Sequence, residues 1–185
     1  MSSISRRLVA LLTADAMTVT LRPGVRPEDG DAVRRLVAST GFFTGPEEEI
    51  AVELVADALA KGEAGSGYHF IFAEEAGRPV GYVCFGPIAG TEASHDLYWI
   101  VVDAARRGGG VGRLLERACT DAIRGLGGRR LYVDTSSRAQ YDPTRAFYRA
   151  CGYTEVARLD DFYAAGDGKV IFVKALDAGS ASGAA

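Results

Sequence analysis

Glycines cluster at one point of the chain, between a strand-like run and a helix-like run. The apolar run at residues 98–102 predicts a buried strand, and residues 111–126 carry apolar side chains at helical spacing. Glycine lets the backbone approach a ligand closely, and the first turn of a helix offers unpaired N–H groups at the positive end of its dipole. Residues 107–113 therefore predict an anion site, and phosphate is the anion most often bound by such loops.

Two other kinds of phosphate-binding loop match this segment less well. In a dinucleotide-binding fold the first glycine directly follows the strand, whereas a linker at residues 103–107 intervenes here and Arg113 stands in place of the third glycine. Asp134 imitates the acid that closes the next strand of that fold, so dinucleotide binding stays an alternative. A P-loop is excluded, because no Gly-Lys-Ser/Thr follows the glycines.

The acyl-CoA loop of the GNAT N-acetyltransferase superfamily reads Arg/Gln-x-x-Gly-x-Gly/Ala. The residues that meet this pattern are Arg107, Gly108, Gly109, Gly110, Val111 and Gly112. A second motif of the superfamily is a helix tyrosine followed by a glycine and an aromatic residue, met here by Tyr148, Gly152 and Tyr153. Over residues 18–176 the chain resembles this superfamily. It departs from it at Tyr141, seven residues before the helix tyrosine, where many members carry asparagine.

The resemblance implies an α/β fold with a central mixed, mostly antiparallel sheet of six or seven strands, flanked by helices and splayed between the fourth and fifth strands. It also implies acetyl-CoA as acyl donor, no metal, and direct transfer of the acetyl group to a primary amine in a ternary complex. The residues expected to bind acetyl-CoA are Ile100, Val101 and Val102 through their backbone, and Arg107, Gly108, Gly109, Gly110, Val111, Gly112 and Arg113 around the pyrophosphate.

Two side chains are candidates for acid–base chemistry. An attacking amine must lose a proton, since an alkylammonium has a pKa of about 10.4, and the departing thiolate benefits from an acid. Tyr148 stands where many relatives carry that acid, and the alternative is a packed aromatic residue. Asp96 stands on the fourth strand where some relatives carry a catalytic carboxylate, and the alternative is a substrate-orienting or structural role. His95, its neighbour, must point to the opposite face of the sheet.

The sequence leaves the acceptor open. In this family the predicted loop at residues 160–168, which contains acidic and aromatic residues, and the acids at residues 47–49 would line the acceptor mouth. Such a rim would favour a cationic amine, and a solvated loop with helix-capping acids is an equal alternative. The expected partner is a small-molecule or peptide amine, and many relatives are homodimers. The alternative function is a non-catalytic acyl-CoA-binding sensor or interaction module.

Hydrophobic periodicity and turn residues predict the element order β-α-α-β-β-β-α-β-α-β-β, a mixed sheet with helices on its faces. The predicted strands cover residues 19–22, 68–74, 80–85, 95–102, 130–135, 154–159 and 169–174. The second helix is expected to end at Gly62 and to bury one stripe, made of Ile50, Leu54, Val55, Ala58 and Leu59. The fourth helix is expected to begin at Asp142 and to turn Phe147, Ala150 and Cys151 toward the core.

The composition excludes several classes of protein. The length of 185 residues suffices for one domain, at residues 18–176, between an extension at residues 1–17 and a disordered tail at residues 177–185. The net charge of −3 gives no reason to expect nucleic-acid binding, and no apolar stretch approaches the roughly 20 residues of a membrane span. Three isolated cysteines predict neither a disulfide framework nor a zinc site and favour a cytoplasmic location. Residues 1–16 are expected to form a short helix or loose extension rather than a targeting signal.

Overall fold

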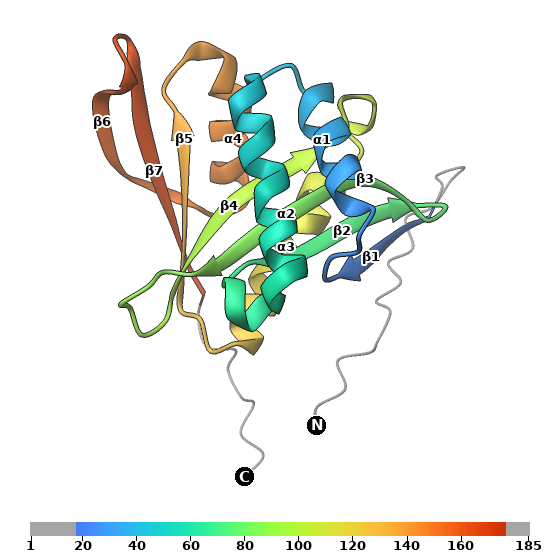
Figure 1. The fold of residues 1–185 in the computed structure, drawn as a ribbon. Helices are drawn as coiled ribbons and strands as arrows, with labels where there is room; N and C mark the ends of the chain where they lie inside the picture. The colour runs from blue at the N-terminus through green and yellow to red at the C-terminus, as the bar shows by residue number, and fades with distance from the viewer. Residues whose placement is uncertain (1–17, 177–185) are drawn as a thin grey trace. The chain divides into compact units, whose positions relative to one another are not determined.

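The computed structural model describes residues 18–176 (Figure 1). Within them the strands are β1 (Val19–Pro23), β2 (His69–Glu75), β3 (Arg78–Pro87), β4 (Ser94–Val102), β5 (Arg130–Ser136), β6 (Thr154–Ala164) and β7 (Asp167–Ala175). The helices are α1 (Asp29–Ser39), α2 (Gly45–Ser66), α3 (Val111–Gly125) and α4 (Asp142–Ala150), with two 3-10 turns, η1 (Ala104–Arg106) and η2 (Ala139–Tyr141). The expectations for the N-terminal extension and the C-terminal tail lie outside the described residues.

The seven strands form one sheet in the order β1-β2-β3-β4-β5-β7-β6. The pairs β1–β2, β5–β7 and β6–β7 are antiparallel, and β4–β5 is parallel. The β4–β5 pairing covers only residues 94–96 of β4 and 130–132 of β5, although both strands continue beyond it. The mixed, mostly antiparallel sheet with a parting between the fourth and fifth strands is therefore confirmed.

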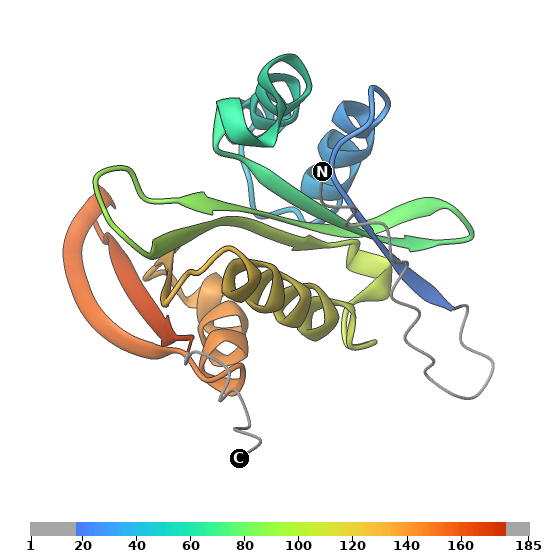
Figure 2. The same cartoon turned by 90° about the horizontal axis from the view of Figure 1, so that it is seen from below.

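The chain forms two compact units. Among the described residues, the first comprises residues 18–84 and 99–116, and the second comprises residues 85–98 and 117–176. In the first unit α1 and α2 pack on one face of β2 and β3 (Figure 2). The centre of this core is aromatic, with the Tyr82 ring 6.2 Å from Phe70 and 5.9 Å from Phe72. Burial of apolar side chains in a core of this kind is the main contribution to the stability of the folded unit.

In the second unit, helices cover one face of the sheet, and no described helix of this unit covers the other face. Leu131 and Val133 on β5 and Phe172 on β7 are buried together with Ile123 of α3 and Tyr148 of α4. Side chains alternate between the two faces of a strand, so the residues between these positions point to the other face. That other face carries Asp96, Tyr132, Asp134 and Lys169.

The expected buried stripe of the second helix is wrong in part. Ile50 and Leu59 are 50% and 42% exposed, because the buried stripe of α2 is Ala51, Val55 and Ala58, at spacings of four and three residues, and both side chains lie outside it. The helix breaks at a non-helical Gly62, where the sequence predicts its end, and a second helical segment follows to Ser66. The helix begins with a capping box of Thr44 and Glu47.

Two further expectations need correction. The predicted loop at residues 160–168 is mostly strand, since β6 extends to Ala164 and pairs there with Asp167 of β7. The register is irregular between Leu159 and Ala164, and this irregularity hid the strand from a simple alternation rule. In α4, Arg145 and Tyr148 are buried and Ala150 is exposed, so the core-facing side differs from the expected one.

No helix of the described residues is long and apolar enough to cross a membrane. Within the same residues, no group of three or more His, Cys, Asp or Glu side chains is arranged to hold a metal ion. The cysteines Cys84, Cys119 and Cys151 form no disulfide, and burial raises the pKa of the Cys84 thiol.

Candidate active site

The linker between β4 and the glycines is fixed by short-range and long-range contacts within the first unit. The Asp103 amide donates to the Val80 carbonyl at 2.9 Å, and the Asp103 carboxylate accepts from the Ala105 amide at 2.9 Å, which starts η1. The Arg106 side chain donates to the carboxylate of Glu75 on β2 at 2.8 Å. These contacts set where β4 ends and how the following loop leaves it.

The glycine loop at residues 108–110 lies on the surface directly before α3. Gly108 and Gly110 have φ values of +79° and +83°, a left-handed conformation that other L-residues adopt at a cost of about 1–2 kcal/mol. Among the described residues, the amides of Gly108, Gly109 and Gly110 donate to no hydrogen-bond acceptor. Val111 and Gly112 begin α3, where helix N–H groups also lack intrahelical partners. Exposed amides and a helix N-terminus thus meet in one place.

Two arginines beside this loop are available for an anion. Arg107 and Arg113 are exposed, and neither forms an ion pair within the described part of the chain. The Arg107 guanidinium lies 4.9 Å from the ring centroid of Phe42, which follows α1, so an aromatic residue orients it. By contrast, Arg106 pairs with Glu75 and is already neutralised. Phe42 was not singled out in the sequence, because nothing local links it to a residue so much later in the chain.

The strand residues expected to lie along the ligand belong to the last part of β4. Val101 is 3% exposed and joins the aromatic core of the first unit, whereas Ile100 and Val102 are half-buried. The backbone of Val101 is closely approached by β3, since a Cβ added to Gly81 would lie 2.8 Å from the Val101 carbonyl oxygen. Packing therefore holds the position of this strand firmly.

Asp96 lies where the pairing of β4 with β5 ends, opposite Tyr132. It is half-buried, while the preceding His95 is 6% exposed and lies against Gly128 on the other face of the sheet, as strand alternation predicts. Burial, followed by the negative charge of Asp134, raises the pKa of Asp96, and the positive charge of Lys169 opposes the rise. A raised pKa brings a carboxylate closer to the range of a useful base.

Tyr148 lies on the helix-covered face of the second unit. Its ring is 5.4 Å from Tyr153 and 5.8 Å from Phe172, and the side chain is almost fully buried. Burial raises the pKa of the Tyr148 phenol, which keeps the phenol protonated at neutral pH. The predicted packing and the predicted proton-donor role are compatible, since a protonated phenol can donate.

Arg145 is a buried cation that the sequence did not single out. Its guanidinium donates to the carbonyls of Ser136 and Arg138 and pairs with Asp142. The side chain is only 5% exposed, so it fixes the segment between β5 and α4 from inside. This is the segment where Tyr141 replaces the usual asparagine of the family, and the arginine supplies donors to its backbone.

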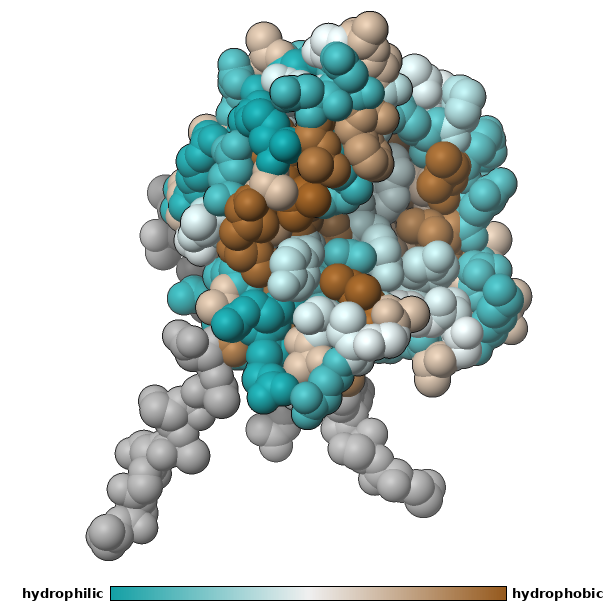
Figure 3. Space-filling model, turned by 90° about the vertical axis from the view of Figure 1, so that its left-hand side faces the viewer, coloured by the Kyte–Doolittle hydropathy of each residue, from teal (hydrophilic) through white to brown (hydrophobic). Residues whose placement is uncertain are grey.

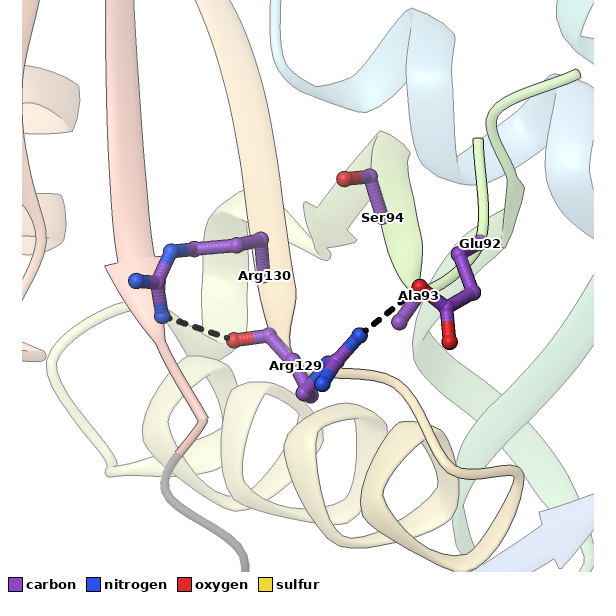
Figure 4. Close-up of a pocket in the computed structure, with 5 residues that line it drawn as sticks. All are labelled: Glu92, Ala93, Ser94, Arg129 and Arg130. Atoms are coloured by element: carbon purple, nitrogen blue, oxygen red, sulfur yellow. Dashed lines mark hydrogen bonds and ion pairs between the residues drawn. The ribbon is translucent and has the colours of Figure 1, made fainter. Parts of the chain in front are cut away.

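The hollow that opens at the other end of β4 and β5 is a separate feature (Figure 4). It measures about 370 Å³ and is lined by Glu92, Ala93, Ser94, Arg129 and Arg130. Arg129 pairs with Glu92 at 3.2 Å, and both side chains are well exposed. Because the hollow lies where the two strands begin, it contains neither Asp96 nor Tyr148.

Apolar side chains are exposed along β6, the edge strand of the sheet. They are Val156, Leu159, Phe162 and Tyr163, each about half-exposed. The surface view from the side of β6 and β7 shows apolar patches among hydrophilic groups (Figure 3). Charged residues and two register irregularities on the same strand oppose pairing with another strand.

Comparisons with known proteins agree with this architecture. The model of the acetyltransferase (GNAT) family matches residues 31–153. A protein from Desulfovibrio desulfuricans, assigned to the GNAT family of acetyltransferases, has a crystal structure that matches with a TM-score of 0.84 at 45% identity, over 86% of this chain and 99% of that chain. The chain therefore belongs to the GNAT family of acetyltransferases. No curated protein sequence matches it significantly.

More distant structures share the fold. An aminoglycoside 6'-N-acetyltransferase complexed with coenzyme A matches with a TM-score of 0.66 at 19% identity, over 82% of this chain and 92% of that chain. The ribosomal-protein-S18-alanine N-acetyltransferase from Escherichia coli matches with a TM-score of 0.69 at 17% identity, over 86% and 94%. The acceptors named for these two proteins differ in chemistry, so the shared fold does not select an acceptor.

Proposed function

We propose that this protein transfers the acetyl group of acetyl-CoA directly to a primary amine of a small molecule or peptide. The observation that carries the proposal is the glycine loop, where amides without partners, the start of α3 and two unpaired arginines converge. A diphosphate is a doubly charged anion with many acceptor oxygens, and this set of donors suits it. Arg107 and Arg113 would flank the diphosphate and neutralise part of its charge.

The thioester arm of the donor would follow the backbone of the last part of β4. Ile100, Val101 and Val102 would supply amide and carbonyl groups, which hydrogen-bond without regard to side-chain type. Strand N–H groups of this kind can also stabilise negative charge on a carbonyl oxygen. The firm packing of Val101 favours this role, because a preorganised donor needs no rearrangement during the reaction.

Asp96 would accept the proton of the acceptor ammonium, directly or through water. The neutral amine then attacks the thioester carbonyl carbon, a C–N bond forms, the C–S bond breaks, and Tyr148 would protonate the departing thiolate. The nitrogen loses its second proton as the amide forms, and this proton, passed directly or through water, would restore the Tyr148 phenol. The raised pKa of Asp96 supports the first role, and the Tyr148 phenol, which is protonated at neutral pH, carries the proton that the second role requires. No covalent enzyme intermediate is needed.

Turnover with a panel of amines tests the proposal. Purified protein is incubated with acetyl-CoA and each of a set of amines: polyamines, aminoglycosides, aryl-alkylamines, amino acids and peptides with free N-termini. Release of free thiol above the rate without amine is expected for at least one class, and mass spectrometry of the product should show one added acetyl group. Tight binding of coenzyme A without thiol release from any amine would favour the non-catalytic sensor instead.

A further inference from the structure

A row of charged side chains crosses β4, β5 and β7 in the second unit, on the sheet face that the helices of this unit do not cover. Asp96 on β4 lies opposite Tyr132 on β5, and Asp134 is two residues further along β5 and so shares its face. Lys169 on β7 forms an ion pair with the Asp134 carboxylate. In the β5–β7 register Lys169 lies opposite Ser136, diagonal to Asp134, a distance that a lysine side chain spans.

Lys169 is held on both sides. Its ammonium lies 4.5 Å from the ring centroid of Phe162 on β6, and its side chain is only 20% exposed. An ammonium between an aromatic face and a carboxylate is attracted by both. The lysine is thus ordered toward Asp134 rather than extended into solvent.

Burial is the largest influence on the pKa of Asp96, and among the charged groups around it this row has the main effect. On its own strand the same face carries Ser94 and Tyr98, and on β5 it carries Arg130 and Tyr132. Arg130 donates to the Arg129 carbonyl at 3.2 Å. Residues 85–87, the part of β3 in this unit, contain no titratable side chain, and Asp161 of β6 accepts from the Gly166 amide at 2.7 Å.

Asp96 and Asp134 lie on neighbouring strands, and their negative charges repel. Burial already favours a proton on Asp96, and the negative charge of Asp134 adds to this preference. The ion pair with Lys169 acts most directly on Asp134, because it places the ammonium against that carboxylate, whereas the same charge only partly offsets the raised pKa of Asp96. Asp96 forms no ion pair with any described residue and is left to exchange a proton.

We propose that Lys169 is a positioning residue for the acetyl transfer proposed above: by holding Asp134 in an ion pair, it leaves Asp96 as the single carboxylate on this face that accepts the acceptor's proton. This inference rests on the proposed function, in which Asp96 is the base. The charge of the row then sums to one negative charge from two carboxylates and one ammonium, which matches the charge of one acceptor ammonium.

The test follows Asp96 directly, by NMR titration of carboxyl-labelled aspartates in the full chain without substrate. Lys169→Met keeps the length of the side chain and removes the charge, and we expect it to raise the Asp96 midpoint by about one pH unit. Lys169→Arg should restore the wild-type midpoint. Asp134→Asn, which removes the repelling charge, should lower the midpoint instead, so the two neutralising variants shift it in opposite directions.

If Lys169 had only a structural role, the Asp96 midpoint would not depend on the charge of residue 169. Phe162→Leu loosens the lysine without removing its charge, and it should lower the melting temperature while leaving the Asp96 midpoint within about 0.3 units. An unchanged midpoint in Lys169→Met, or an equal rise in Lys169→Met and Lys169→Arg, would overturn the inference. With an amine that turns over, the acidic limb of kcat/KM should move with the midpoint. Failure of the proposed function would show separately, as absent coenzyme A binding by calorimetry or absent thiol release in the wild type.

Discussion

Substitutions at Gly110 test the anion site, because the space around this residue allows the effect of a charge to be measured apart from the effect of side-chain size. A Cβ added to Gly110 would have no atom within 4 Å, so a small side chain meets no clash there. The φ of +83° disfavours most residues, but asparagine and aspartate tolerate this left-handed region better than others do. Gly110→Asp and Gly110→Asn therefore form a matched pair, equal in size and similar in backbone strain, which differ by one negative charge.

The magnitude follows from Coulomb's law. A carboxylate about 4 Å from a phosphate charge repels it by about 1 kcal/mol in water and about 4 kcal/mol at an effective dielectric of 20. The loop is exposed and the diphosphate carries more than one charge, so a loss of about 2–4 kcal/mol is expected, or about 30- to 1,000-fold in Kd. Backbone strain is present in both the free and the bound protein, so Gly110→Asn should change Kd by less than about threefold while lowering the free energy of unfolding by about 1 kcal/mol.

Isothermal titration calorimetry with coenzyme A measures both variants against the wild type. The difference in Kd between the two variants should become smaller as the salt concentration rises from about 0.05 M to 0.5 M, since screening weakens charge repulsion. Wild-type affinity in both Gly110→Asp and Gly110→Asn at low salt would refute the placement of a diphosphate on this loop. Equal loss in both variants would point to backbone geometry rather than charge.

Three further substitutions test the acid, the base and the buried arginine. Tyr148→Phe should lower kcat by about 100-fold with coenzyme A affinity nearly unchanged by calorimetry, and wild-type kinetics would remove Tyr148 from the proton-donor role. Asp96→Asn should abolish the acidic limb of kcat/KM, which in the wild type falls as pH drops through the raised pKa of Asp96, and a retained limb would exclude Asp96 as base. Because a raised folded-state pKa means stability lost as pH rises through it, Asp96→Asn should also be more resistant to urea at neutral pH than the wild type. Arg145→Ala should lower the free energy of unfolding by about 3 kcal/mol in urea titrations, since it strands two carbonyls, whereas the exposed Arg149→Ala should lose less than about 1 kcal/mol.

The residue type of Asp96, the proposed base, says little about its function, and its surroundings in the fold support the proposed role. Asp96 is one of many acids in the chain, and strand position alone makes it a candidate. Its raised pKa depends on burial and on Asp134. Lys169, which we infer to leave Asp96 as the base, lies on β7, far from Asp96 in the sequence. These partners meet only because β5 lies between β4 and β7 in the sheet.

Local patterns predicted the elements well where packing agreed with propensity. The strand before the glycines, the amphipathic α3 and the helix that starts at Asp142 were all expected from the sequence, because each depends on residues close together in the chain. The errors arose where burial was decided by distant neighbours. Ile50 and Leu59 are apolar but lie outside the stripe that faces the sheet, and the irregular second half of β6 has too many acids for a simple strand pattern.

The sequence by itself determined the family and the glycine loop, because a turn with positive φ and the first turn of a helix are set by consecutive residues. Only the tertiary structure decided which side chains surround that loop and the proposed base. Phe42 beside Arg107 and Lys169 beside Asp134 are contacts between segments that lie far apart in the sequence. Charge and burial act through space at a few ångströms, and no spacing along the chain encodes that distance.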